Sequence, residues 1–169
     1  MVESPVEDPT SRGYQPPMNV QFSVFLDMRV GKMLELLNVF DGQALTIAGL
    51  SVIDATDHAV VRLLTSRNEL ARRLLHRHGL PFCEADVLVA ELKDHDSLSD
   101  LCIALLNTEL NIQYMYPLLI TPRGRNALVI HTDDYILAGQ ILRKKMFTLL
   151  CENDLGDNAT GSDPLDRGD

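Results

Sequence analysis

An internal repeat limits the folds open to this chain more than any other feature of its sequence. Residues 33–40 carry apolar side chains at i, i+3, i+4 and i+7, which is the spacing of one helix face, and residues 98–105 repeat the pattern. A second helical pattern at residues 70–75 recurs at residues 137–142. Repetition over this distance is typical of duplicated structural units, so we expect two copies of one fold.

Strand-like segments alternate with these helices in both halves of the chain. The segments of the first half are residues 20–26, 45–53, 59–65 and 81–84, and those of the second half are residues 87–92, 112–120, 127–132 and 147–151. They are rich in β-branched and apolar residues, and turn-forming residues separate the middle two segments in each half. Each half therefore has the order strand, helix, strand, strand, helix, strand.

This order predicts an α+β fold made of two ferredoxin-like units, each an antiparallel sheet with two helices on one face. We place the first unit at residues 19–85 and the second at residues 86–152. Because Glu84 to Val87 leaves no room for a linker, the units should pack together. We expect them side by side, as an eight-stranded antiparallel sheet with four helices on one face. Two sheets packed back to back are the alternative.

Some local signals accompany this pattern. Residues 1–18 and the acidic residues 153–169 lack periodicity and predict disordered tails. Ser66 and Glu69 have the spacing of a capping box at the start of the second helix. The three cysteines lack close pairing and read as reduced, small core residues; they are Cys83, Cys102 and Cys151.

Charge and composition exclude several classes of partner. The formal net charge is -9, whereas binding to nucleic acid or an anionic membrane requires clustered cations. There is no apolar run of membrane-spanning length, and the N-terminus lacks a secretory signal pattern. We therefore expect a cytoplasmic protein that binds neither nucleic acid nor membrane.

The sequence lacks a convincing catalytic or cofactor-binding pattern. His76 and His78 are two positions apart, so they do not share a helix face and are poorly spaced for one metal ion. Neither a glycine-rich dinucleotide loop nor a P-loop occurs. An enzyme would need a pocket that joins Arg29, His95 and a carboxylate, and no nucleophile–base pairing is visible. We expect no catalytic activity, no metal and no cofactor.

The turn between the first strand and the first helix is the best candidate for a binding site. It reads LDMRVGKM at residues 26–33, and Gly31 lets a ligand approach the backbone closely. A helix N-terminus also offers backbone N–H groups that suit a carboxylate. On spacing alone, an ordinary strand-to-helix turn is the simpler reading.

The pattern of strand, turn and amphipathic helix resembles an ACT domain, in which this turn has the form x-R-P-G-x-L. The sequence has Arg29-Val30-Gly31 there, with Val30 where proline is usual. Residues 110–116 resemble the GINVEYMY stretch of bacterial proteins made of two ACT domains, and residues 82–92 resemble their domain junction. The resemblance covers about residues 19 to 155. It implies a regulatory protein that senses an amino acid where the turn of one domain meets the second strand of its neighbour.

Carried onto this chain, the resemblance implies two sites. The first-site residues are Asp27, Met28, Arg29, Val30, Gly31, Asn111, Ile112, Gln113, Tyr114 and Tyr116. The second, weaker site comprises Asp94, His95, Asp96, Ser97, Thr46 and Ile47. In the second turn His95-Asp96 replaces Pro-Gly, and Leu110 replaces a glycine before the strand. Its two aspartates would repel a ligand carboxylate.

We therefore expect a non-catalytic regulatory module that binds an amino acid between its two units. The expected partners are this ligand and either a second copy, as a homodimer, or an enzyme of amino-acid metabolism. The alternative is a structural or protein-interaction module whose ligand sites are degenerate.

Overall fold

The computed structural model describes residues 15–94 and 98–156, and its elements follow the repeated order expected from the sequence. The strands are β1 (Asn19–Asp27), β2 (Ile47–Ala55), β3 (His58–Thr65), β4 (Phe82–Glu91), β5 (Ile112–Pro117), β6 (Ala127–Thr132) and β7 (Thr148–Leu149). The α-helices are α1 (Lys32–Phe40), α2 (Asn68–Arg77), α3 (Leu98–Leu106) and α4 (Tyr135–Lys144). Two short 3-10 helices, η2 (Pro122–Gly124) and η3 (Glu152–Leu155), complete the description.

One strand, β4, belongs to both copies. Residues Phe82 to Val87 pair with β1, and Leu88 to Glu91 pair with β6, so the strands join into one antiparallel sheet of order β2-β3-β1-β4-β6-β5. The short β7 pairs with β4 beside β1. The described sheet therefore has seven strands instead of the expected eight, because β4 replaces both the last strand of the first unit and the first strand of the second. The junction contains no glycine or proline that would turn the chain, so it simply continues as extended strand.

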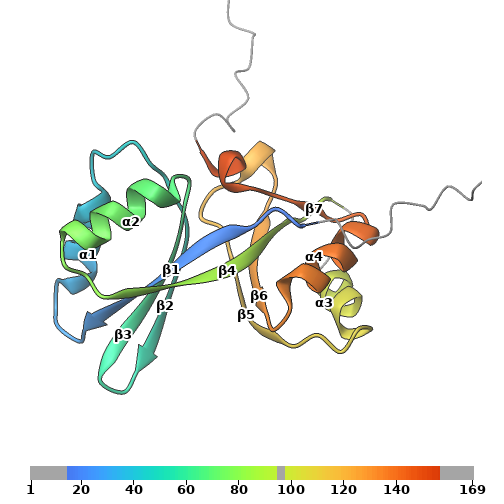
Figure 1. Ribbon diagram of the computed structural model, residues 1–169, viewed down its shortest axis with the longest axis horizontal. Coiled ribbons are helices and arrows are strands. Elements are labelled where there is room, and N and C mark those ends of the chain that lie inside the picture. Colours follow the sequence, from blue (N-terminus) through green and yellow to red (C-terminus); the bar gives the residue numbers. More distant parts are fainter. Residues whose placement is uncertain (1–14, 95–97, 157–169) are drawn as a thin grey trace, which may run out of the picture.

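Both pairs of helices cover the same face of the sheet, as predicted. On β4, Phe82 points toward α2, where its ring centroid lies 4.9 Å from that of His76. Leu88 packs with α3 and α4. Because it follows Phe82 by an even number of residues on the same strand, both side chains lie on one face of the sheet. The sheet is strongly curled, so the helix pairs lie at opposite ends of the molecule (Figure 1).

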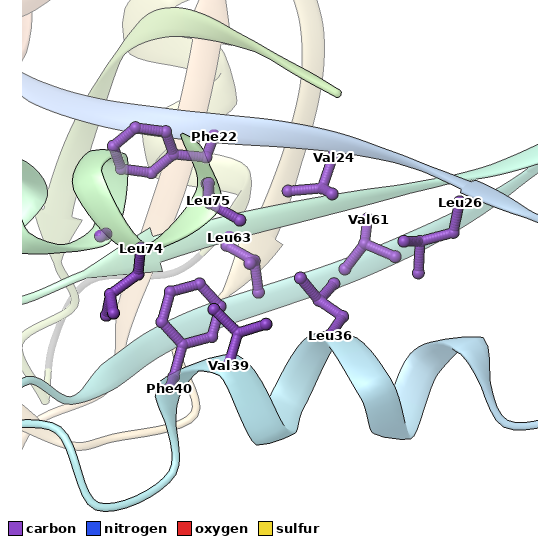
Figure 2. Close-up of a cluster of buried hydrophobic side chains, with 11 residues drawn as sticks. Phe22, Val24, Leu26, Leu36, Val39, Phe40, Val61, Leu63, Leu74 and Leu75 are labelled. Carbon is purple, nitrogen blue, oxygen red and sulfur yellow. The ribbon is translucent and has the colours of Figure 1, made fainter. Parts of the chain in front are cut away.

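Each copy has its own aliphatic core between helices and sheet. In the first copy, Phe22, Val24 and Leu26 of β1 meet Leu36 of α1 and Leu75 of α2 (Figure 2). The second core has the same construction and is built around Leu88, Leu101, Leu105, Ile130 and Leu142. These two clusters contain most of the helix faces that the sequence repeat predicts, but Leu98 and Leu137, which the pattern places on those faces, are exposed.

A third core fills the concave side of the curled sheet and joins the two copies. It contains Leu64 of β3, Val87 and Val89 of β4, Val129 of β6 and Tyr116 of β5. At the rim, the outer strands meet, because the Leu119 N–H donates to the Ala48 carbonyl oxygen at 2.8 Å. Gly49 stands opposite Leu118 there. The sheet thus closes on itself at one point, which fixes the two copies relative to each other.

Both chain ends are packed further than the sequence predicts. Leu155 lies within the range expected to be a tail, yet it is fully buried in the third core. The Glu152 carboxylate accepts a 2.6 Å hydrogen bond from the backbone N–H of Asn68 at the start of α2. At the other end, Pro16 is buried against Gly139 of α4, where an added Cβ would stand 2.4 Å from the proline. Each end therefore contacts the opposite copy.

Two local predictions are wrong. Ser66 does not cap α2, because its hydroxyl oxygen instead accepts a hydrogen bond from the backbone N–H of Thr46 at 2.8 Å, and Glu152 takes over at the helix. The cysteines are not core residues, since Cys83 is exposed and Cys102 and Cys151 are half-buried. Within the described residues, no helix has the length and apolar character needed to cross a membrane.

Replacement of Leu155 by alanine tests the packing of η3. Truncating a fully buried leucine should lower the free energy of unfolding by about 2–5 kcal/mol in urea denaturation. Leu119→Ala is the matched control, because Leu119 is 63% exposed and its truncation should cost no more than about 0.5 kcal/mol. Equal, small effects of both variants would contradict the burial of Leu155.

Candidate functional site

The turn between β1 and α1 has the conformation that glycine favours. Gly31 lies immediately before α1 with φ at 89°, in the left-handed region where other residues are strained. Among the described residues, no side chain caps this helix. The first turn of α1 therefore presents backbone N–H groups to an acceptor from outside, and the helix dipole favours an anion there.

A cavity of about 320 Å³ lies beside this turn. Its described lining comes from the first copy, from the end of β1, the turn, the start of α1 and the β2–β3 hairpin. The apolar lining consists of Leu26, Met28, Val30, Met33, Val52, Ala59 and Val61, and the charged lining of Asp27, Arg29 and Lys32. This combination offers one apolar wall and both signs of charge.

The charged groups at the cavity are paired with one another or with a neighbour at its rim. Arg29 Nη2 lies 3.1 Å from the Asp27 carboxylate, and Lys32 Nζ lies 2.6 Å from Glu35. Apart from the partly covered Lys32, these side chains are mostly exposed. Exposed ion pairs contribute at most about 1 kcal/mol, so an incoming anion can compete for both cations.

The predicted site residues at β5 and just before it do not line this cavity. Asn111 exchanges two hydrogen bonds with Asp133 in the turn before α4, and Ile112 packs against the second core. Gln113 is exposed, whereas Tyr114 and Tyr116 point into the concave side of the sheet. Of the predicted first-site residues, the structure thus gathers Asp27, Met28, Arg29, Val30 and Gly31 at one turn and leaves the β5 group apart from that cavity.

The two tyrosines belong to a polar network between the copies. The Tyr116 hydroxyl donates to Gln21 Oε1 at 2.8 Å, and Gln21 Nε2 donates to the Tyr114 hydroxyl at 2.9 Å. The Arg62 guanidinium lies 3.6 Å from the centre of the Tyr114 ring, and the His131 ring stacks on it at 4.8 Å. Gln21 is fully buried, so its hydrogen bonds hold β1 of one copy to β5 of the other.

The second predicted site is only partly described. Asp94 is exposed after β4, and His95, Asp96 and Ser97 lie outside the described residues. Thr46 is tied to Ser66 through both its backbone N–H and its carbonyl oxygen. Ile47 begins β2 and packs on the first core.

Two groups of residues near the candidate site could not be identified from the helix and strand patterns alone. The cavity wall of Val52, Ala59 and Val61 comes from the hairpin around the short ATDH turn, and the register of its strands places these three residues on one face. The polar network has a signal in the sequence, because Gln21 and Ser23 alternate with apolar residues in β1, which indicates that the second face of this strand meets polar groups. In residues 15–94 and 98–156, no group of three or more His, Cys, Asp or Glu side chains could hold a metal ion.

Tyr116→Phe tests the network through its pH dependence. Burial raises the pKa of the Tyr116 phenol well above its ordinary value, so the folded protein keeps a proton that the unfolded chain releases above about pH 10. Near neutral pH the variant should be less stable by about 1–2 kcal/mol, because it loses the hydrogen bond to Gln21.

As the pH rises from about 9 to 11, only the wild type loses this contribution, so the difference in unfolding free energy should shrink by about 1 kcal/mol. Urea denaturation of both proteins at each pH measures it. A difference that stays constant over this range would contradict the assigned role of the buried phenol.

Comparison with known proteins agrees with the repeat and the fold. A family model described as an ACT domain pair matches residues 18–159, which confirms the resemblance seen in the sequence. No curated protein sequence matches the chain significantly.

Two solved structures show how far the fold is shared. A crystal structure of a protein from Bacteroides thetaiotaomicron has a TM-score of 0.74 and 20% identity, covering 84% of this chain and 98% of that one. The regulatory subunit of aspartate kinase from Thermus thermophilus, ligand free, has a TM-score of 0.50 and 9% identity, covering 76% and 91%. At these identities the likeness concerns the fold alone. The family match, which spans both copies, shows that this chain belongs to the ACT domain pair family.

Proposed function

We propose that this chain is a regulatory protein that binds a free amino acid in the cavity beside Arg29, Val30 and Gly31. The observation that carries the proposal is the composition of this one cavity, in which cations, a carboxylate and an apolar wall surround an uncapped helix N-terminus. Each part of an amino acid has a complementary group there.

The ligand carboxylate would lie at the N-terminus of α1. Backbone N–H groups and the helix dipole favour an anion at this position, and Arg29 and Lys32 add two positive charges. Asp27, on the same rim, suits the ligand ammonium group. Binding would exchange the exposed ion pair between Arg29 and Asp27 for two pairs with the ligand.

The ligand side chain would face Val52, Ala59 and Val61 of the hairpin, with Leu26 and Met33 on the other side. These residues offer no polar partner, so a polar side chain would lose its hydrogen bonds with water on entry. A cavity of about 320 Å³ lies at the small end of ligand pockets. We therefore propose an aliphatic amino acid as the ligand.

Membership of the ACT domain pair family supports a regulatory, ligand-binding role rather than a catalytic one. Under this proposal the protein has no catalytic activity of its own and transmits ligand binding to a partner protein. We propose that this partner is an enzyme of amino-acid metabolism.

Calorimetric titration with each of the twenty amino acids tests the proposal. An aliphatic amino acid should bind, and at a hundredfold excess over its Kd it should raise the unfolding free energy by about 2.7 kcal/mol. Arg29→Gln should weaken binding about tenfold, because it removes a charge-assisted contact to the carboxylate. Arg77→Gln on α2 is the matched control and should bind as the wild type does. Binding unaffected by Arg29→Gln, or no binding at all, would contradict the site.

Ala59→Leu tests the apolar wall separately. The larger side chain should fill part of the cavity and lower affinity for an aliphatic amino acid at least about tenfold, with the fold checked by circular dichroism. If affinity is unchanged in a folded variant, the ligand side chain does not lie against the hairpin.

A further inference from the structure

Helix α3 is the least amphipathic of the four helices, although it lies on the outside of the molecule. Among its nine residues only Ser99 and Asp100 are polar. Three of its apolar residues face inward, namely Leu101, Ala104 and Leu105. A helix that is apolar on nearly all sides is normally buried on all sides, yet none of residues 15–94 and 98–156 provides that cover for the outer face of α3.

The exposure of the outer residues is large. Leu98 is 51% exposed, Ile103 54% and Leu106 72%, and Met146 in the turn after α4 is 75% exposed. The equivalent helix of the first copy is α1, and its outer face differs, because the exposed Asn38 and Asp41 stand where the second copy has Ile103 and Leu106. The apolar surface is therefore a property of the second copy and does not follow from the duplicated fold.

A groove runs between α3 and the end of α4 within this surface. Its volume is about 230 Å³, and it is lined by Asp100, Ile103, Ala104, Asn107, Lys145 and Phe147. It thus holds a negative charge on the α3 side and a positive charge on the α4 side. Lys93 adds a second cation nearby, with its Nζ donating to the Met146 carbonyl oxygen at 3.0 Å.

We propose that a second copy of this chain docks on this surface, with α3 packed against α3 across a two-fold axis. A two-fold interface is self-complementary, so a surface with both charge signs around an apolar centre matches itself. Asp100 of one copy can then approach Lys145 of the second, and the contact occurs twice. A partner of one charge sign would match only one side of the groove.

The overall charge is consistent with this choice of surface. Copies with a net charge of -9 repel one another, and Lys93, Lys144 and Lys145 make the region around the groove one of locally higher positive charge. Contiguous apolar surface of this kind marks interaction sites in soluble proteins. A standard interface covers about 800 Å² on each partner, so the α3 face would form its centre and polar residues its rim.

Sedimentation velocity over a concentration series of the full chain tests this proposal. The wild type should be a dimer in the micromolar range, and the Ile103→Glu, Leu106→Glu double variant should raise the dimer dissociation constant at least about a hundredfold. The single variants Leu106→Glu and Met146→Glu should each weaken it in the same direction, and circular dichroism checks that every variant folds.

The matched control is Leu119→Glu, which places the same charge on an exposed leucine at the rim where β2 and β5 meet. Its dimer should be as stable as that of the wild type. A monomeric wild type, or a dimer that Leu106→Glu and Met146→Glu leave intact, would overturn the proposal. Amino-acid titrations of the double variant keep this outcome separate from the ligand site, because the proposed cavity lies in the other copy.

Discussion

The whole architecture depends on β4, because the backbone hydrogen bonds of this one strand hold both copies. Its first part completes the sheet of the first copy, and its second part begins the sheet of the second. A strand shared in this way cannot act as a hinge, since rotation of one copy would break pairs on both sides of the junction. Curling of the sheet then brings β2 and β5 together and encloses the third core.

The contact between the copies combines two kinds of interaction with different consequences. Val87, Val89 and Val129 contribute apolar burial, which is nondirectional and tolerates sliding. Gln21 adds direction, because its buried amide oxygen accepts a hydrogen bond from Tyr116 while its amide nitrogen donates to Tyr114. The apolar residues therefore supply affinity between the copies, and the glutamine specifies their register.

Periodicity accounts for the part of the fold that could be predicted. The helix faces around Leu36 and Leu101 and the hairpin around the ATDH turn depend on residues close in sequence, and the structure confirms them. The missed features depend on residues distant in sequence. Ser66 has a good capping sequence, yet Glu152, 86 positions later, occupies the helix end. Leu155 follows a polar segment and is buried only because the curled sheet leaves a place for it.

The same distinction explains what could be predicted of the site. The turn at Arg29 to Gly31 is local, so its position between strand and helix could be predicted from the sequence. Its apolar wall depends on which residues of β2 and β3 share a face with Leu26, which requires the register of a sheet. The composition of α3 contains a signal for its apolar outer face, because only Ser99 and Asp100 among its nine residues are polar.

The contact of Glu152 with α2 has a consequence for folding during synthesis. During synthesis the ribosome completes the first copy, up to β4, well before it adds Glu152. The carboxylate of this residue accepts the hydrogen bond at the start of α2. The third core also waits for Leu150 and Leu155. Domains often fold as units during synthesis. Here the first-made half reaches its final form only after residues 150–155 have emerged, so a translation product that stops before them lacks both the Glu152 contact and the complete third core.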